Sequence, residues 1–127
     1  MKTTNELFQP EWSVWDRLIE ENGITIDRAQ GSAHPQYEEI IYPIDYGYVN
    51  GTVGTDGEEV DVFVGTASNG LVGAILTRDH RKQDRECKLI YNCTMTEIYL
   101  VNGFLNFDQE LMTGRLVLRV DLKDIRT

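Results

Sequence analysis

Short apolar runs separated by turn residues are the feature that most constrains the fold of this chain. The runs are rich in Val, Ile and Tyr, are bounded by Gly, Asn and Asp, and occupy residues 46–52, 59–65, 71–77 and 87–93. Runs of this length and composition predict strands of one sheet. A short alternating run at 24–28 and a closing run at 115–120 extend the pattern. The chain is therefore expected to be mainly β.

Residues 11–22 have helical spacing. Their apolar side chains recur at the i, i+3, i+4, i+7 positions of one helix face, and they are Trp12, Trp15, Leu18 and Ile19. The Asn22-Gly23 pair that follows is a good stop signal. The pattern predicts an N-terminal helix with one apolar side.

A second helix is expected near the C-terminus, from Thr94 or Thr96 to about Phe107, with a Thr as its cap. Residues 29–39 are polar and contain Gly and Pro, which indicates a loop. The tail from Asp121 is expected to fray. Together the elements predict an α+β, mainly β fold, in which a small curled sheet or barrel carries two helices on its outside.

The composition limits the size and the partners of the protein. A chain of 127 residues is expected to form one domain spanning 1–127. The net charge of −9 argues against binding to nucleic acid or to an anionic membrane, because both require a basic surface. The first residues contain no apolar signal segment, and no run approaches the roughly 20 apolar residues of a membrane helix. We therefore expect a cytoplasmic protein.

The two cysteines, Cys87 and Cys93, lie six residues apart. In an extended strand they are separated by about 20 Å, which is too far for a disulfide bond. They are expected to be reduced thiols, as is usual for cytosolic proteins.

Acidic residues crowd the start of one predicted strand. Asp56, Glu58, Glu59 and Asp61 fall within six residues and adjoin the apolar run that ends at Val64. Carboxylates this close repel one another unless a cation lies between them. A hard divalent cation such as Mg²⁺ binds carboxylate oxygens and suits this arrangement.

The segment YPIDYGYVNGT, residues 42–52, followed by DGEEVDVFV, residues 56–64, resembles a known signature. The soluble, Mg²⁺-dependent inorganic pyrophosphatases, which have an OB-like β-barrel, show Y-P-x-N-Y-G-Y and then D-G-D-P-x-D-V. The matching residues are Tyr42, Pro43, Tyr46, Gly47, Tyr48, Thr52, Asp56, Gly57, Asp61 and Val62. With weaker matches on either side, the resemblance extends from Ile24 to Tyr91 and implies a shortened, divergent member with an OB-like curled sheet or barrel.

The resemblance implies a set of metal ligands. Asp56 and Asp61 stand where the family holds its central metal ions, and either Asp79 or Asp84 takes the place of a third ligand from a later loop. Glu38 takes the place of an outer carboxylate of the metal site. The implied cofactor is Mg²⁺, with Mn²⁺ as a possible substitute.

The resemblance also implies catalytic and substrate-binding residues. Glu58 stands where the family has the Asp that accepts a proton from the attacking water, and Tyr46 is implied to hydrogen-bond near the metal site. Tyr42 and Lys88 are implied to contact phosphate, with Lys88 paired to Glu86.

The chain departs from the family where phosphate is bound. Gln36 occupies the substrate-binding position of a phosphate-binding Lys, and the strand that carries a phosphate-binding Arg is missing between Glu38 and Tyr42. Glu58 is one methylene longer than the family's Asp. Other basic residues are available as replacements, namely Arg28, Arg78, Arg81, Lys82 and Arg85.

The hypothesis with the most support is a Mg²⁺-dependent hydrolase that cleaves diphosphate or a small phosphoanhydride to phosphate. The alternative is a catalytically degenerate relative that binds metal and a phosphorylated ligand without turnover. A third reading is a structural or partner-binding module. A homo-oligomer is expected because Trp12 and Trp15 lie on one helix and because members of the family commonly assemble.

Overall fold

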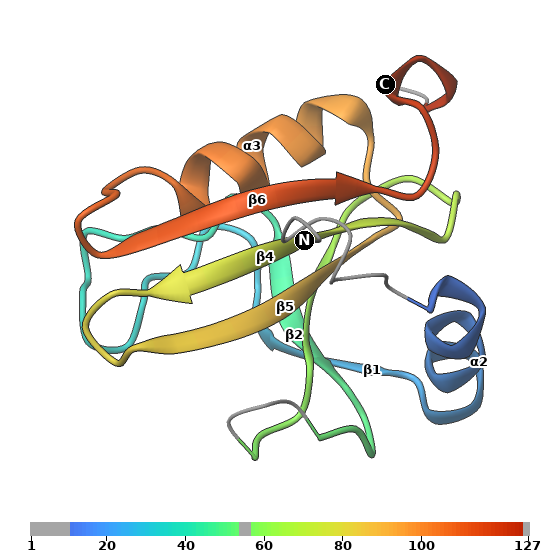
Figure 1. Cartoon of the computed structure of the whole chain (residues 1–127), viewed down its shortest axis with the longest axis horizontal. Helices are drawn as coiled ribbons and strands as arrows, with labels where there is room; N and C mark the ends of the chain where they lie inside the picture. Colours follow the sequence, from blue (N-terminus) through green and yellow to red (C-terminus); the bar gives the residue numbers. More distant parts are fainter. Residues whose placement is uncertain (1–10, 54–56, 126–127) are drawn as a thin grey trace, which may run out of the picture.

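The computed structural model describes residues 11–53 and 57–125, and Figure 1 shows their arrangement. The elements in chain order are α2 (Trp12–Asn22), β1 (Ile24–Arg28), β2 (Asp45–Val49), β3 (Asp61–Val64), β4 (Leu71–Asp79), β5 (Asp84–Tyr91), α3 (Met95–Leu105), β6 (Met112–Leu118) and the short 3₁₀ helix η1 (Leu122–Asp124). The predicted α+β, mainly β fold is confirmed.

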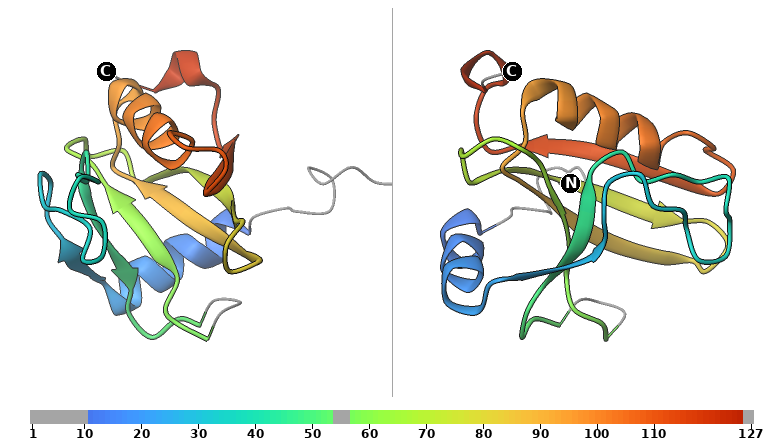
Figure 2. Two further views of the ribbon diagram at one scale, coloured as in Figure 1. Left: turned by 90° about the vertical axis from the view of Figure 1, so that its left-hand side faces the viewer. Right: turned by 180° about the vertical axis from the view of Figure 1, so that it is seen from behind.

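The six strands of the described residues form one mixed sheet in the order β1-β2-β3-β5-β4-β6. All neighbouring strands are antiparallel except β3 and β5, which are parallel. The sheet curls, so that β2 runs across the direction of β4, β5 and β6 (Figures 1 and 2). Since β1 and β6 end the strand order without pairing to each other, the curled sheet is OB-like but is not closed into a barrel.

Side chains of a strand alternate between the two faces of the sheet, so each face has its own core. The core on the α3 face is built around Phe63, Ile75 and Ile90, which pack with Ile98 and Val101 of the helix. Figure 2 shows α3 lying along this face. This face also carries the polar side chains described below.

The opposite face is covered in part by α2. Ile19 of the helix packs with buried residues of the sheet, and the predicted apolar residues of the helix lie against the same core, as Trp12, Trp15 and Leu18. The helix ends at Gly23, whose φ of 77° lies in the left-handed region that glycine adopts without strain. The predicted N-terminal helix is therefore confirmed.

Helix α3 begins with a capping box. The Thr94 side chain accepts a hydrogen bond from the backbone N–H of Glu97, and the Glu97 carboxylate accepts one from the backbone N–H of Thr94. The same carboxylate accepts hydrogen bonds from the Thr66 backbone N–H and hydroxyl. Glu97 thus joins the helix to the segment that follows β3, and Thr94 is the predicted cap.

Two sequence-based expectations about strand ends and the tail need correction. Strand β2 ends at Val49 instead of residue 52, because the Thr52 hydroxyl donates to the Val49 carbonyl and accepts from the Val60 N–H. The tail does not fray within the described residues. Ile125 is 6 % exposed and packs into the α3-side core, because η1 turns the chain back onto it.

Gly47 marks a close approach of two backbones in the middle of β2. A Cβ at this position would overlap the backbone of Thr25 and Ile26 on β1. Glycine is required here because the two strands pass too near each other for any side chain.

Both cysteines are free thiols, as predicted. No helix of the described ranges has the length and hydropathy needed to cross a membrane.

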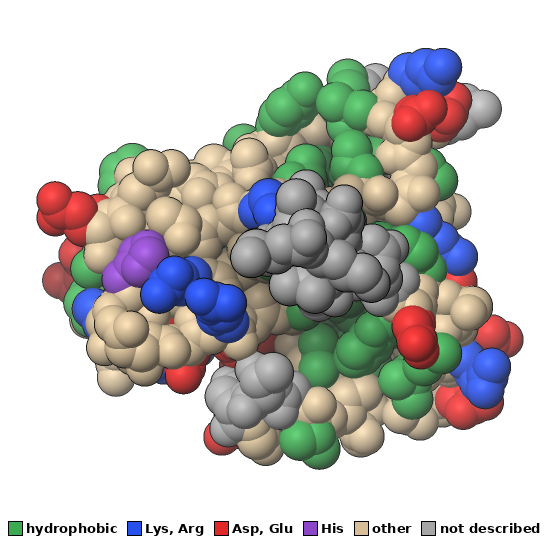
Figure 3. Space-filling model, in the orientation of Figure 1, with side chains coloured by type: hydrophobic (Ala, Val, Ile, Leu, Met, Phe, Trp, Pro, Cys, Tyr) green, Lys and Arg blue, Asp and Glu red, His purple; other side chains and the backbone are tan. Residues whose placement is uncertain are grey.

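Large apolar side chains are exposed over α3 and just after it, and they include Tyr99, Leu100 and Phe107. Figure 3 shows hydrophobic side chains gathered over α3. The homo-oligomer stays a prediction.

Candidate functional site

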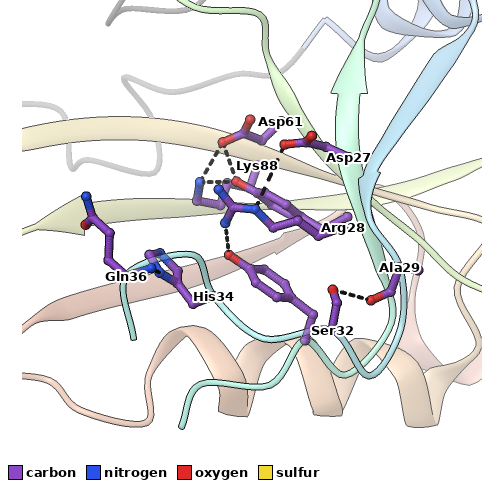
Figure 4. A network of polar contacts seen from close by, with 10 residues as sticks. Asp27, Arg28, Ala29, Ser32, His34, Gln36, Asp61 and Lys88 are labelled. Carbon is purple, nitrogen blue, oxygen red and sulfur yellow. Dashed lines mark hydrogen bonds and ion pairs between the residues drawn. The ribbon is translucent and has the colours of Figure 1, made fainter. Parts of the chain in front are cut away.

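Side chains from four neighbouring strands meet on the α3 face of the sheet. Strand pairing places Arg28 of β1 opposite Tyr46 of β2, and Tyr46 opposite Phe63 of β3. Asp61 lies two residues before Phe63, and Lys88 of β5 lies beside it because β3 and β5 pair in parallel from Val62 and Leu89. Figure 4 shows these polar side chains directed toward one another.

A β-bulge directs Arg28 into this group. The pairing between β1 and β2 shifts between Ile26 and Arg28, so that Ile26 opposes Gly47 while Arg28 opposes Tyr46. The extra residue, Asp27, turns Arg28 onto the α3 face. A bulge that re-aims a side chain is common beside functional sites.

At the centre, a phenol and an ammonium bind the same carboxylate oxygen. Asp61 Oδ2 accepts hydrogen bonds from the Tyr46 hydroxyl at 2.5 Å and from Lys88 Nζ at 2.7 Å. Lys88 Nζ also donates to the Tyr46 oxygen at 3.0 Å and lies 3.7 Å from Glu86 Oε2. The Lys88 side chain is 7 % exposed and that of Asp61 is 24 % exposed. The ammonium of the ion pair is therefore buried, and its carboxylate is open to solvent.

The charges in this group are well defined at neutral pH. Burial by itself lowers the pKa of Lys88, but the negative charge around its ammonium, supplied by Asp61 and Glu86 at neutral pH, outweighs burial and raises the pKa overall. Burial raises the pKa of Tyr46, so its hydroxyl stays neutral and donates to Asp61. The site thus presents a fixed ammonium, a neutral phenol and flanking carboxylates.

Aromatic rings connect this centre to Arg28. The rings of Tyr42 and Tyr46 stack with their centroids 5.1 Å apart. The guanidinium of Arg28 lies 5.2 Å from the Tyr42 ring centroid and 5.6 Å from that of Tyr46, and it donates a hydrogen bond to the Tyr42 hydroxyl. Cation–π contacts of this kind hold a guanidinium in place. Burial raises the pKa of Tyr42, so this hydroxyl is also neutral.

A second aromatic group lies beyond Tyr42. The His34 ring stacks with Tyr42 at a centroid distance of 6.4 Å and contacts the Tyr37 ring at 5.2 Å. Arg81, from the turn between β4 and β5, lies over the Tyr37 ring at 5.0 Å and donates to its hydroxyl. Residues 29–42, which include the predicted loop 29–39, thus carry the rings that connect β1 to the β4–β5 turn.

The other predicted metal ligands that the structure describes lie outside the Tyr46–Asp61–Lys88 group. Asp79 is buried at the end of β4, where its carboxylate accepts the backbone N–H groups of Arg81 and Lys82. Asp84 pairs with Asp79 across the hairpin, and Glu38 is exposed in the loop. Asp56 lies outside the described residues.

Among the described residues, no group of three or more His, Cys, Asp and Glu side chains is close enough to hold a metal ion. The described oxygen ligands still suit a hard cation. Asp61 and Glu86 both place a carboxylate near Lys88 Nζ, and the Asp61 carboxylate is open to solvent. With only one or two such ligands, a Mg²⁺ ion keeps most of its waters. The metal-ligand set stays a prediction.

Two predicted functional residues are exposed. Glu58 lies in the segment before β3, and Gln36 lies in the 29–42 loop, where its backbone N–H donates to Nδ1 of His34 at 3.0 Å. Their proposed roles in proton transfer and substrate binding stay predictions. The sequence suggested no role for His34, and it named Arg28 only among the basic residues that could replace the missing phosphate-binding cations. The bulge that directs Arg28 into the site leaves no mark in the sequence.

Comparison with known proteins gives a family match, a structural likeness and one negative result. The family model described as inorganic pyrophosphatase matches residues 20–80. A crystal structure of an inorganic phosphatase from Anaplasma phagocytophilum is 14 % identical in sequence, with a TM-score of 0.50 over 75 % of this chain and 81 % of that one. At this identity the likeness concerns the fold. No curated protein sequence matches significantly.

Proposed function

Since residues 20–80 place the chain in the inorganic pyrophosphatase family, as a shortened and divergent member, we propose that it hydrolyses diphosphate or a small phosphoanhydride with a bound divalent cation. The observation that carries the proposal is the Tyr46–Asp61–Lys88 group. Tyr46 and Asp61 lie in the matched segment and Lys88 lies on β5, beyond it, and the group combines a carboxylate for a cation with an ammonium for a phosphate oxygen.

The chain's residues have separable roles in this proposal. Asp61, with Asp56 and one of Asp79 and Asp84, would hold the cation, and Glu38 would support it from outside. When bound, Mg²⁺ or Mn²⁺ neutralises the diphosphate and makes a coordinated water more acidic. Because the Lys88 ammonium is already fixed in place, it would stabilise charge that develops on a substrate oxygen at low cost, while Tyr46 orients Asp61 through its hydrogen bond.

Hydrolysis adds one water to a phosphorus and breaks the bridging P–O bond, which leaves two phosphates. A carboxylate must accept a proton from that water, and we propose Glu58 for this step. Tyr42 contacts the substrate through its hydroxyl. Glu58 is exposed in the structure, so we expect it to act only once substrate and cation order its surroundings.

A second candidate function is binding of metal and a phosphorylated ligand without turnover. The specific observation in its favour is Gln36, which has a neutral side chain at the position of a phosphate-binding Lys and is exposed. A site that keeps its carboxylates and its buried Lys88 but lacks such cations retains affinity more readily than rate.

The test is phosphate release from diphosphate by the purified protein, with and without millimolar Mg²⁺ or Mn²⁺. The variants are Asp61→Asn and the matched control Glu20→Gln, which removes an exposed carboxylate from α2 on the other side of the sheet. Metal-dependent release that Asp61→Asn abolishes and Glu20→Gln keeps is the expected result. Thermal unfolding of each variant checks that the fold is intact. Equal activity in all three proteins, or none in the wild type, would reject hydrolysis at this site.

If the wild type releases no phosphate, binding separates the two candidate functions. Mg²⁺-dependent binding of methylenediphosphonate, which has no bridging oxygen to cleave, supports the non-catalytic function. A ligand that binds only the folded state raises its stability, so a shift in melting temperature is a sufficient readout.

A further inference from the structure

The cationic side chains around His34 stand out in a chain whose net charge is −9. Partial burial lowers the pKa of His34, and the positive charges of Arg28, Arg81 and Lys82 lower it further. These charges come from β1 and from the β4–β5 turn, which are far apart in sequence. The fold therefore gathers positive charge around one imidazole ring.

Aromatic contacts hold these groups in a row. Arg28 lies over Tyr42, Tyr42 stacks with His34, His34 contacts Tyr37, and Arg81 lies over Tyr37. The two arginines also donate to the hydroxyls of Tyr42 and Tyr37. A guanidinium has five N–H donors, so each arginine has donors left after this bond.

The loop that carries His34 is tied down by its own backbone. Gly31 N–H donates to the Tyr42 carbonyl, Tyr42 N–H to the Ser32 carbonyl, and His34 N–H to the Ile40 carbonyl, at 2.8–3.0 Å. The His34 Nδ1 accepts the Gln36 N–H, so in the neutral ring the proton is on Nε2. His34 therefore offers a hydrogen-bond donor in a fixed position whether or not it is charged.

Carboxylates compensate this charge only weakly. Arg28 Nε lies 3.9 Å from Asp27 Oδ2, and Arg81 Nε lies 4.0 Å from Asp79 Oδ1, both at the limit of an ion pair. The Asp27 side chain is 59 % exposed, and exposed pairs of this kind stabilise little. Two oriented guanidinium groups with a weakly compensated charge are suited to a phosphate, which accepts several hydrogen bonds at once.

We propose that Arg28, His34 and Arg81 form a cationic subsite that binds phosphate oxygens of the substrate, with Arg28 next to the Asp61–Lys88 pair. Arg28 and Lys88 both contact the Tyr46 ring, at 5.6 Å and 5.4 Å from its centroid, and we expect a diphosphate to contact both side chains. This inference rests on the proposed function and names the residues that take over from the missing phosphate-binding Lys and Arg. The ligand class is an unsubstituted phosphate or diphosphate.

Calorimetric titration with methylenediphosphonate and with inorganic phosphate tests the subsite without requiring turnover. The variants Arg28→Gln and Arg81→Gln each remove one guanidinium, and we expect the dissociation constant to rise about 10- to 100-fold in each, as for the loss of a charge-assisted hydrogen bond. His34→Asn is expected to raise it less. Arg28→Lys keeps the charge without the planar fork and is expected to restore only part of the affinity.

Arg78→Gln is the matched control, because Arg78, although named among the possible replacement cations, is exposed on β4 and alternates to the face of the sheet opposite Ile75 of the α3-side core. It removes the same charge and is expected to leave the dissociation constant within twofold. The subsite is overturned if Arg28→Gln and Arg81→Gln bind as tightly as the wild type, or if Arg78→Gln weakens binding as much as they do. Arg81 is 45 % exposed, so its variant folds even if the Arg28 variant does not.

These outcomes are separable from those of the proposed function. Phosphate release by the wild type with an unchanged KM in both arginine variants rejects the subsite and leaves hydrolysis standing. Binding that depends on Arg28 and Arg81, in a protein that releases no phosphate, supports the subsite and rejects hydrolysis.

Discussion

The buried ammonium of Lys88 predicts how the site responds when its partner loses its charge. In Asp61→Asn the side chain keeps its size, but Lys88 retains only Glu86 as a carboxylate, at 3.7 Å. Removing one partner of a buried ion pair costs about 3–5 kcal/mol. Because Asp61 is partly exposed and Glu86 remains, we expect a loss of about 2–3 kcal/mol in the free energy of unfolding, close to the value of a charged hydrogen bond.

A double-mutant cycle isolates this interaction. Lys88→Met keeps the unbranched side chain and removes the charge, and Asp61 then keeps its bond from Tyr46. We expect the double variant to be less destabilised than the sum of the single variants by about 1–3 kcal/mol, because neither charge is then left without its partner. Urea unfolding of the four proteins at neutral pH gives the four free energies.

The pH dependence is a further part of this prediction. The pKa of Lys88 is raised, so its contribution is complete below the unfolded value of about 10.4 and is lost only as pH rises through the higher folded value. The coupling should therefore be constant between about pH 6 and 9. A cost below about 0.5 kcal/mol for Asp61→Asn, or a coupling near zero, would refute the reasoning and leave the pair as a surface contact.

Three other predictions concern the frame around the site. Gly47→Ala should prevent stable folding or lower the melting temperature strongly, because its Cβ overlaps the β1 backbone; near-wild-type stability by circular dichroism would contradict the pairing. Glu97→Gln should cost about 1–2 kcal/mol at pH 7. Burial alone raises the pKa of Glu97, but hydrogen bonds from Thr94 and Thr66 outweigh burial and lower the pKa. The cost of Glu97→Gln should therefore shrink as pH falls below about 4.5. A cost in urea melts that is the same at pH 7 and pH 3 would refute this expectation. Burial raises the pKa of Cys87 to about 11 and of Cys93 to about 12, so both thiols should react slowly with a disulfide reagent at pH 8 and rapidly in urea, and rapid labelling of the native protein would show that they are accessible.

The sequence was a good guide to elements whose signals are local. Apolar spacing and a stop signal are enough for α2, and a capping Thr is enough to place the start of α3 at Thr94 or Thr96, of which the structure uses Thr94. The burial of Ile125 was not predictable, because a short polar tail has no local sign that a core lies beside it.

The residues of the candidate site fall into two groups, those that the sequence predicted and those that depend on non-local structure. Tyr46, Asp61 and Lys88 were named from the resemblance, and the structure brings them together. The orientation of Arg28 depends on a bulge opposite another strand, and the ring of His34 depends on how a 14-residue loop folds back on itself. Both are non-local, so spacing along the chain does not contain them.

The parallel pairing of β3 with β5 has a consequence for how the protein folds. Strands β1, β2 and β3 pair in chain order and β4 pairs with β5 across a short turn, whereas β3 meets β5 only after the chain has gone out along β4 and returned. Contacts that close a long loop form late, because the entropy of closure must be overcome first. Lys88 and Asp61 stand on either side of this junction, so the order of events is expected to leave any partly folded species without its ion pair. A chain with both halves intact but undocked would have secondary structure and no site.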